Sequence, residues 1–526
     1  NQRIGATTDN LKLPLKKAWE YAPPSTINRA WSGPTGRTIE GKVLRDRIRF
    51  DDAFQVASVG EQVFFGSSVD HQVYCKNVKT GKTEWAFYTG GPVRLAPTVF
   101  KGKVFFGSDD GFVYCVAADS GKLVWKLRGG PADEWLIARG EMISRWPCRT
   151  GVMIEGGVAY FGVGVFPHED IFLYAVNPDD GKIIWKRDDI SESDAGRSDL
   201  TPQGYLLAEN DLLVVPSGRT LPAALDRNTG KFLHKRAPGW RGEAGGVVGG
   251  TRAMLADGQI YAAGAHHMLA MSQKDGSVGF GYFDGHQLAV SGDSAYTATG
   301  VNVGRLDRAA YAAASIRRHK LKGTISSLQR SARSAKGKAL ADIRAKIEAA
   351  DKELETLDEV GYVWKQPCEA DAALIVAGDL VFVGGEKEVV AFRTEDGKQV
   401  WNAEVEGETR GLAAANGRLF ASTTTGNVYT FATDSAASDA TTALNQNPYP
   451  ADKLSKTYAD AAEQILKNAN SKSGYCLVLG SERGRLAYEL AKRSNLKIYG
   501  IEPDAEKVAE SRRLLSSAGL YGHRVT

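Results

Sequence analysis

The sequence predicts an all-β protein, an eight-bladed β-propeller with an inserted helical hairpin, followed by a partial α/β domain of Rossmann-like topology. Three observations lead to this prediction. A pattern of β-forming residues, a glycine turn and a tryptophan recurs at a period of roughly 40–50 residues, as in propellers and solenoids. A segment at residues 305–358, rich in Ala, Lys, Arg and Glu, interrupts the pattern. After a polar linker, the last residues change to alternating strand and helix patterns.

Each copy of the repeat contains four short strands. In the clearest copy, residues 104–107 are a run of β-formers, residues 109–111 a hairpin turn, residues 113–116 the next strand, and residues 123–125 the outer strand. Two further copies place Tyr, Gly and Trp at the same offsets, at positions 74, 81 and 85 and at positions 174, 181 and 185. Four strands in a copy make one propeller blade.

Weaker copies extend the series to about eight. Trp401 ends one copy, Trp364 remains in a copy that has lost its turn, and His234 and Phe280 replace the tryptophan in two others. The last copy, residues 418–431, stops before its outer strand, for which residues 16–20 are a candidate. We therefore expect a propeller over residues 15–434 that closes by pairing its two ends, because closure leaves no exposed sheet edge.

This arrangement resembles the PQQ-like repeat β-propellers, which include the quinoprotein alcohol dehydrogenases and the outer-membrane assembly lipoprotein. The resemblance rests on the recurring Gly-Lys-x-x-Trp signature. It implies that the glycine makes a turn while the tryptophan docks against the neighbouring blade, at Trp85, Trp125, Trp185, Trp364 and Trp401. In the family, pyrroloquinoline quinone (PQQ) is held by adjacent cysteines, calcium ligands and a catalytic Asp. This sequence has no adjacent cysteines, so we do not expect it to bind PQQ.

Composition excludes several classes of protein. The 526 residues are 43% hydrophobic, which allows large cores and more than one domain, and the net charge of +4 is too small to indicate a partner. The five cysteines form no C-x-x-C pair, which argues against a zinc site or a disulfide framework. No stretch is long and apolar enough to span a bilayer. Because the chain begins with Asn, we expect its native start to be missing, which is compatible with a removed signal peptide.

Two loops gather residues that favour a partner or ligand. Residues 139–149 hold three arginines, a glutamate and a tryptophan, and Arg and Trp are common interface anchors. Residues 166–170 add His, Glu and Asp, a set that can bind a cation. The predicted face, for a protein partner or a small anionic ligand, consists of Arg139, Glu141, Arg145, Trp146, Arg149, His168, Glu169 and Asp170. The alternative is that Arg145 or Arg149 merely ties the loops together through Glu169 or Asp170.

No metal site is predicted. The pair at 266–267 is a weaker metal candidate than the second loop, and residues 194–199 form a third polar loop.

The interruption at residues 305–358 predicts an antiparallel helical hairpin, because its apolar residues recur at helical spacing. Residues 317–322 make its first arm strongly basic. This favours contact with an anionic partner, either an acidic protein, nucleic acid or lipid headgroups, of which nucleic acid is the least expected. A solvated coiled-coil face is the alternative.

A polar linker at residues 435–452 leads to a tail, residues 453–526, with the pattern strand-helix-strand-helix after a first helix. A glycine turn, with Gly480, Ser481 and Gly484, follows its first strand, and Glu502 ends the second. Glycines let a nucleoside approach a helix N-terminus, and a carboxylate accepts hydrogen bonds from ribose hydroxyls.

The tail resembles the class I S-adenosylmethionine-dependent methyltransferases, since residues 479–486 match their first motif and residues 502–504 their second. The resemblance implies S-adenosylmethionine binding. It has two departures, because Glu482 replaces the middle glycine of the family motif and Val478 the acidic residue. The alternative is a methyltransferase fold that has lost its activity. We also expect that the protein is truncated at residue 526, before a doubly wound sheet is complete.

The first functional hypothesis is therefore a binding and scaffolding module. The second is an S-adenosylmethionine-dependent methyltransferase whose propeller recognises the substrate, and the third is a quinone-dependent dehydrogenase. Relatives of this kind of propeller are mostly exported, so we expect an extracytoplasmic, periplasmic location. The cytoplasm is the alternative, because S-adenosylmethionine is a cytosolic cofactor.

Overall fold

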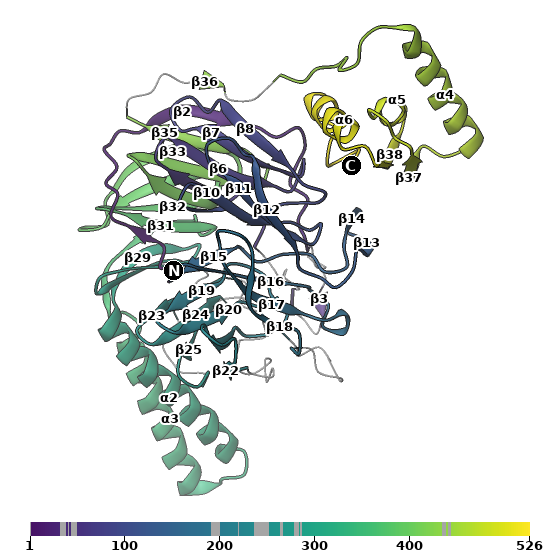
Figure 1. The fold of residues 1–526 in the computed structure, drawn as a ribbon. Coiled ribbons are helices and arrows are strands. Elements are labelled where there is room, and N and C mark those ends of the chain that lie inside the picture. Colours follow the sequence, from purple (N-terminus) through teal and green to yellow (C-terminus); the bar gives the residue numbers. More distant parts are fainter. Residues whose placement is uncertain are drawn as a thin grey trace. The chain divides into compact units, whose positions relative to one another are not determined.

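The computed structural model describes residues 2–31, 38–39, 42–43, 50–190, 200–218, 220–235, 252–263, 267–277, 283–284, 287–433, 438–439 and 443–526 (Figure 1). The chain divides into two units. Unit 1 comprises Asn1–Pro14, Gly33–Ile48 and Glu192–Gly417, and unit 2 comprises Leu15–Ser32, Arg49–Ser191 and Arg418–Thr526. The predicted polar loop at 194–199, Phe280, His266 and residues 435–437 and 440–442 of the linker lie outside the described residues.

In unit 2, the first three copies of the repeat each form a four-stranded antiparallel sheet with its strands in chain order. The sheets are β5 (Val56–Val59), β6 (Gln62–Ser67), β7 (Gln72–Asn77) and β8 (Thr83–Tyr88); β9 (Thr98–Phe100), β10 (Lys103–Gly107), β11 (Phe112–Ala117) and β12 (Leu123–Arg128); and β15 (Met153–Glu155), β16 (Val158–Val163), β17 (Phe172–Val176) and β18 (Ile183–Arg187). The core lies between successive sheets, where Phe64 and Trp85 of the first pack with Val104 and Tyr114 of the second.

Three of the five signature tryptophans, Trp85, Trp125 and Trp364, dock as the resemblance implied, whereas the docking of Trp185 and Trp401 stays a prediction. The Trp85 ring lies over the turn at Gly121, and its Nε1 donates to the Ala118 carbonyl at 2.9 Å. Trp125 makes the same contact with Gly181 in the next repeat. Gly121 has φ +66°, a conformation that L side chains avoid, so the turn and the docking site are set by one residue.

A β-bulge explains the spacing between the glycine and the tryptophan. Cys75 pairs with Trp85 but the next pair is Lys76 with Thr83, so Glu84 has no partner across the strand. The same register shift follows Cys115 and Ala175 in the next two sheets. The extra residue increases the local twist and bends the outer strand.

The N-terminal strand completes the last copy of the repeat, as predicted. β2 (Lys16–Tyr21) pairs antiparallel with β35 (Val428–Ala432), which pairs with β34 (Arg418–Thr423), and β36 (Ser438–Asp439) lies along the other side of β2. Trp19 is fully buried, and its Nε1 donates to the Val78 carbonyl of the first repeat at 2.9 Å.

Unit 1 contains three further sheets of four strands, a run of four paired strands that starts near the N-terminus, and a short hairpin. They are β19 (Leu207–Glu209), β20 (Leu212–Val215), β21 (Ala223–Asp226) and β22 (Phe232–His234); β23 (Ala253–Ala256), β24 (Gln259–Ala263), β25 (His267–Ser272) and β26 (Phe283–Asp284); β27 (Gln287–Ser291), β28 (Ser294–Ala298), β29 (Asn302–Asp307) and β30 (Tyr362–Pro367); β1 (Ala6–Thr7), β31 (Ala373–Ala377), β32 (Leu380–Arg393) and β33 (Gln399–Ala415); and the hairpin β3 (Thr38–Ile39) and β4 (Lys42–Val43). The count of eight blades stays a prediction.

Two long helices, α2 (Arg308–Ala332) and α3 (Gly337–Leu357), stand between β29 and β30 (Figure 1). They pack on each other through a small apolar seam that includes Leu321, Ile325 and Ala350. Among the described residues, no helix has both the length and the hydrophobicity needed to cross a lipid bilayer.

The tail consists of α4 (Lys453–Ala469), β37 (Ser473–Leu479), α5 (Arg485–Arg493), β38 (Asn495–Ile501) and α6 (Ala505–Ser517). β37 and β38 are parallel, and residues 524–526 extend along β38 in the same direction, with Thr526 N donating to the Ile498 carbonyl at 2.9 Å. The helices bury one face of these strands around Val478 and Ile498. The order of elements is the predicted one, while a Rossmann-like domain stays a prediction.

Candidate functional site

The first part of the loop at residues 139–149, up to residue 144, belongs to a separate β-hairpin between two repeat sheets of unit 2. β13 (Trp135–Ala138) and β14 (Glu141–Ser144) form a two-stranded sheet of their own. Ile143 and Glu141 of β14 are buried, at 1% and 3% exposure, whereas Trp135 and Ile137 of β13 are 41% and 54% exposed. The hairpin is therefore anchored through one strand and presents apolar side chains on the other.

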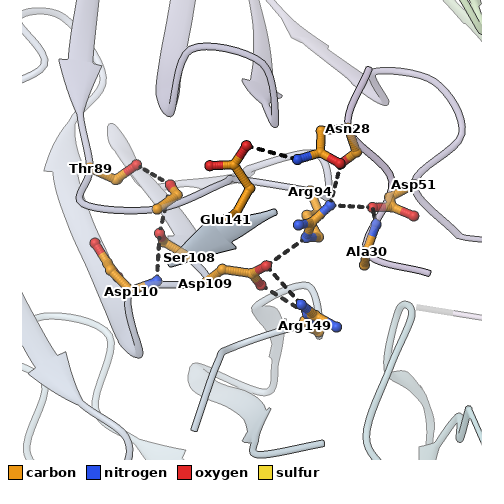
Figure 2. Close-up of polar contacts among 11 residues, drawn as sticks. Asn28, Ala30, Asp51, Thr89, Arg94, Ser108, Asp109, Asp110, Glu141 and Arg149 are labelled. Atoms are coloured by element: carbon orange, nitrogen blue, oxygen red, sulfur yellow. Dashed lines mark hydrogen bonds and ion pairs between the residues drawn. The ribbon is translucent and has the colours of Figure 1, made fainter. Parts of the chain in front are cut away.

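Beneath the hairpin lies a buried ion network (Figure 2). Arg94 donates to Asp51 at 2.6 Å and to Asp109 at 2.7 Å, and Arg149 makes two bonds of 3.0 Å to the same Asp109 carboxylate. Asp51 also accepts from the Ala30 backbone at 2.7 Å. The network joins the segment before the first repeat to the turn of the second repeat and the loop before the third.

The two guanidinium groups set the charge of Asp109. Burial alone would raise the pKa of this carboxyl, but Arg149 and Arg94 outweigh it and hold the pKa below its usual value. The pKa of Asp51, which burial raises, stays above its usual value even beside Arg94. Because two arginines meet two aspartates without access to water, the network is internally balanced. Arg149 therefore has a structural partner and is buried, at 6% exposure.

The repeat turns are fixed by a second kind of carboxylate. Asp110 accepts from the Tyr114 hydroxyl at 2.7 Å and from the Gly90 backbone at 2.8 Å, and in the preceding repeat the Tyr74 hydroxyl donates to Asp70 at 2.5 Å. Ser108 and Thr89 both donate to the carbonyl of the intervening Gly91 (Figure 2). These acids hold the loops in place, and of their oxygens Asp70 Oδ1 is buried without a hydrogen-bond partner among the described residues.

Glu141 links the hairpin to two other parts of unit 2. Its carboxylate accepts from Asn28 at 3.0 Å and pairs with Lys497 of the tail. Burial raises the pKa of Glu141, although Lys497 opposes the shift. One residue along, the Met142 backbone N–H donates to the Tyr499 hydroxyl at 2.8 Å. Glu141 is thus an anchor and not an exposed contact.

The other predicted face residues divide into tied and exposed groups. Arg145 pairs with Glu134 at 2.5 Å and with Glu169, and Trp146, which is buried, donates its Nε1 to the Glu169 carbonyl. The tie between loops is therefore confirmed for Arg145 and Glu169, whereas Arg149 pairs with Asp109.

The exposed members of the predicted face are Arg139, His168 and Asp170. Arg139 lies at the β13–β14 turn with φ +55°, and His168 lies in the 3₁₀ turn η1 (Pro167–Glu169). Within the described ranges, no group of three or more His, Cys, Asp or Glu side chains is placed to hold a metal ion.

His71 marks the place where the tail meets the first repeat within unit 2. The Tyr521 hydroxyl donates to the Thr89 carbonyl at 2.6 Å, and the Tyr521 ring lies edge-on to the His71 imidazole. His71 is 1% exposed, and neither ring nitrogen has a hydrogen-bond partner among the described residues. Burial, with Arg94, Lys497 and Arg512 nearby, lowers its pKa to about 3.

The glycine turn of the tail has an open side. A Cβ at Gly480 would meet nothing within 4 Å, and Gly484 caps the N-terminus of α5 with φ +78°. Glu502 is held by this turn, because its carboxylate accepts from the Glu482 N–H at 2.8 Å and the Asp504 N–H at 3.1 Å. The Glu482 side chain turns to Lys507 at 2.6 Å.

Ser481 lies against β38, with its N–H donating to the Ile501 carbonyl at 3.1 Å and its hydroxyl beside Gly500. The turn therefore brings together Gly480, Ser481, Gly484 and Glu502, the four residues that the sequence singled out.

Comparison with known proteins connects this architecture to a family. The family model described as outer membrane protein assembly factor BamB matches residues 26–187, 167–303 and 350–486. Tetrathionate hydrolase of Acidithiobacillus ferrooxidans is 27% identical over 191 residues, 34% of this chain and 34% of that protein. BamB of Salmonella typhimurium is 28% identical over 116 residues, 21% of this chain and 27% of that protein. The chain thus matches about a third or less of each relative's length.

Among solved structures, quinohemoprotein alcohol dehydrogenase from Comamonas testosteroni superposes with a TM-score of 0.51 at 12% identity, covering 86% of this chain and 81% of that one. A likeness at this identity shows the fold alone. The predicted PQQ-like β-propeller class is confirmed at this level.

The described residues do not fit a quinone site of the kind that the resemblance implies. All five cysteines are free, and Cys75, Cys115 and Cys148 are buried, so no two of them form a disulfide ring. The buried acids Asp51 and Asp109 are neutralised by arginines and are not available as calcium ligands. The expectation that the chain does not bind PQQ stays a prediction.

Sequence reasoning missed Trp135 and Ile137 as surface residues and Arg94 and Asp51 as the partners of Asp109. The apolar run at residues 135–138, followed by the turn at Arg139-Gly140, was a strand-and-turn signal outside the repeat period. The ion network had no sequence signal, because its members are distant in the chain and each is an ordinary charged residue.

Proposed function

We propose that the chain, which belongs to the family of outer membrane protein assembly factor BamB, is a binding and scaffolding module. The partner in this proposal is a protein. In this proposal the repeats close into an eight-bladed propeller that works outside the cytoplasm, in the periplasm. The name of the family describes assembly of outer membrane proteins, which supports a partner that is itself a protein.

The observation that carries the proposal is the β13–β14 hairpin. It is an addition to the repeat, it is anchored by buried Glu141 and Ile143, and it exposes Trp135 and Ile137. An exposed tryptophan beside an exposed aliphatic residue on a rigid support is a typical interface anchor. Arg139 at the turn provides a charged rim for the same surface. The partner surface is therefore this hairpin, and buried Trp146 and Arg149 support it from below.

The test begins with a photo-crosslinking amino acid at position 137 in the source cell, followed by identification and purification of the captured protein. Its affinity is then measured for the natural chain and for the double variant Trp135→Ser/Ile137→Ser. Loss of a central anchor is expected to weaken binding by roughly 30-fold or more. The matched control is Leu123→Ser/Ile183→Ser, which removes two apolar side chains of similar exposure, 48% and 50%, from repeat strands.

The control variant is expected to bind as the natural chain does. Equal affinity of the purified partner for the Trp135/Ile137 variant and the natural chain would contradict the proposal, as would the absence of any protein crosslinked at position 137.

A second candidate function is S-adenosylmethionine-dependent methylation by the tail, with the propeller as recognition domain. The observation that favours it is the open side of Gly480 next to the N-terminus of α5 and to Glu502. There, backbone N–H groups and a carboxylate offer the donors and acceptors that a nucleoside requires. Bound S-adenosylmethionine would supply the methyl group, and Gly480, Ser481, Gly484 and Glu502 would hold its nucleoside part.

Isothermal titration with S-adenosylmethionine tests this second candidate. Binding that Glu502→Ala removes would support it, with Glu506→Ala as a control at a neighbouring acid on α6. An absence of heat would leave the tail without this cofactor, and the scaffold proposal would stand unaffected because it rests on the β13–β14 hairpin.

A further inference from the structure

The first helix of the inserted hairpin and the turn after it carry positive charge only. From Arg308 to Ala341 the sequence contains nine Lys and Arg residues and no Asp or Glu. In a chain whose net charge is +4, this is a strong local excess. Like charges on one helix repel each other, so this run does not stabilise the hairpin itself. We therefore look for an anionic partner outside the hairpin that would attract these charges.

The basic residues near the propeller end of the hairpin have partners within unit 1. Arg308 donates to Asp257 at 2.9 Å, and Arg317 makes two bonds to Glu353, at 2.5 and 2.7 Å. Arg318 donates to the Leu357 carbonyl at 2.8 Å. These three arginines fasten α2 to α3 and to the sheet, so their charge is used internally.

The basic residues at the far end are different. Arg330, Arg333, Lys336 and Lys338 are all exposed, and none of them forms an ion pair within the part of the chain that the structure describes. α3 begins there at Gly337 with neither a side-chain cap nor an acidic residue in its first turn, so its N-terminus adds partial positive charge to the same end. We call residues 330–338 the hairpin tip.

The hairpin holds the tip away from the sheets. Its first helix has 25 residues, which corresponds to a length of about 37 Å. The turn is ordered by its own backbone, since Arg333 N donates to the Arg330 carbonyl at 3.2 Å and Ser334 N to the Ser331 carbonyl at 3.3 Å. The four charges are therefore presented together at the end of a rod and not scattered along a loose loop.

The charge of the second helix decides how an anionic partner can approach. α3 carries Asp342, Glu348, Asp351, Glu353 and Glu355 along its length. A polyanion lying lengthwise along α3 would meet these carboxylates, whereas contact with the tip alone avoids them. Residues 312–361 contain no Phe, Tyr or Trp on which a nucleic-acid base could stack. The geometry favours a broad, flat anionic surface met end-on.

We propose that the hairpin tip docks end-on to a membrane surface through the phosphates of anionic phospholipids. The four basic side chains supply the electrostatic attraction, and the absence of a large apolar side chain at the tip keeps the contact at the headgroup level. The attraction is expected to weaken as salt is added, because exposed charges farther apart than a Debye length, about 10 Å at 0.1 M ionic strength, are largely screened from each other.

The test is co-sedimentation of the full chain with phosphatidylcholine vesicles that contain about 30% phosphatidylglycerol. This anionic lipid gives the vesicles a negative surface potential. The tip variant is Arg330→Gln/Arg333→Gln/Lys336→Gln/Lys338→Gln. Each basic residue near such a surface contributes roughly a fivefold gain in binding, so the variant is expected to bind on the order of several hundredfold more weakly. The control variant, Lys12→Gln/Arg344→Gln/Lys346→Gln/Lys352→Gln, removes the same charge from exposed positions elsewhere in unit 1 and is expected to keep most of the binding.

Two further measurements separate a lipid surface from other anions. The natural chain is expected to ignore vesicles of phosphatidylcholine alone and to bind a 20-base-pair DNA duplex more weakly than the anionic vesicles. The proposal is overturned if the tip and control variants lose vesicle binding equally, if the natural chain does not bind anionic vesicles at low salt, or if it prefers the duplex. Circular dichroism of both variants checks that the helices remain folded.

Discussion

Replacing Gly121 by alanine tests the contact that joins one repeat to the next. The backbone at Gly121 has φ +66°, and a Cβ there would lie 2.7 Å from two atoms of the Trp85 ring. The ring cannot swing away without losing the hydrogen bond from its Nε1 to the Ala118 carbonyl. The substitution therefore imposes two separate costs, a strained backbone and an overpacked contact.

The magnitudes of the two costs can be separated. An alanine in the left-handed region costs roughly 1–2 kcal/mol, and forcing one extra carbon into a packed contact costs roughly 1–3 kcal/mol. We expect Gly121→Ala to lower the free energy of unfolding by about 2–5 kcal/mol. Gly102→Ala is the matched control, because Gly102 has φ +71° and nothing within 4 Å of its added Cβ. It is expected to show the backbone cost alone.

The assay is urea unfolding of the natural chain, of both glycine variants, of Trp85→Leu and of the double variant Trp85→Leu/Gly121→Ala, with the slope of free energy against urea compared throughout. The clash is measured as the difference between Gly121→Ala and Gly102→Ala, and it should shrink in the Trp85→Leu background because the ring is no longer there. Equal costs for the two glycines, or no coupling between positions 85 and 121, would refute the reasoning.

Two more predictions concern buried charge. Burial, and after it Arg94, lowers the pKa of His71 to about 3, whereas the unfolded state has a pKa of about 6.5. Between these two pH values the unfolded state binds more protons than the folded state. The free energy of unfolding is therefore expected to fall by several kcal/mol as the pH drops from about 6.5 towards about 3. His71→Phe should flatten this part of a plot of melting temperature against pH, and an unchanged slope would contradict it. Asp109→Asn leaves two buried arginines without their shared carboxylate and is expected to cost about 3–5 kcal/mol in urea unfolding, whereas Asp179→Asn, at an exposed ion pair, should cost less than about 1 kcal/mol.

The sequence was informative where one residue type has one physical use. The glycine and tryptophan of each repeat, and the strand around Trp19 that completes the last copy, could be placed because turn conformation and ring packing depend on neighbours in the repeat. The bulge next to the Cys75–Trp85 pair was not predicted. An extra residue before the tryptophan keeps the same offsets in every repeat and requires no particular residue type.

The candidate site was less predictable because charged residues have many uses. Arg149 and Glu141 in a loop suggested a binding face. In the structure Arg149 pairs with Asp109, and Glu141 bonds to Asn28 and Lys497. These pairings depend on distances between segments far apart in the chain. No local pattern distinguishes an arginine that will be buried from one that will stay exposed.

The difference between repeats and insertions leads to a more general argument about function. Within the described repeats, turn acids such as Asp110 and Asp70 hold their own tyrosines, and Asp109 binds two arginines, so the polar groups of the repeats are largely committed to the fold. The two surfaces for which we propose partners both lie on additions to the repeats, the exposed Trp135 and Ile137 on the β13–β14 hairpin and the positive charge on the hairpin tip. A repeat scaffold acquires partners through such additions because they can change without disturbing the docking of one repeat on the next. Deleting residues 312–357 and joining the ends with a short turn should therefore leave binding through Trp135 intact while removing the affinity for anionic vesicles.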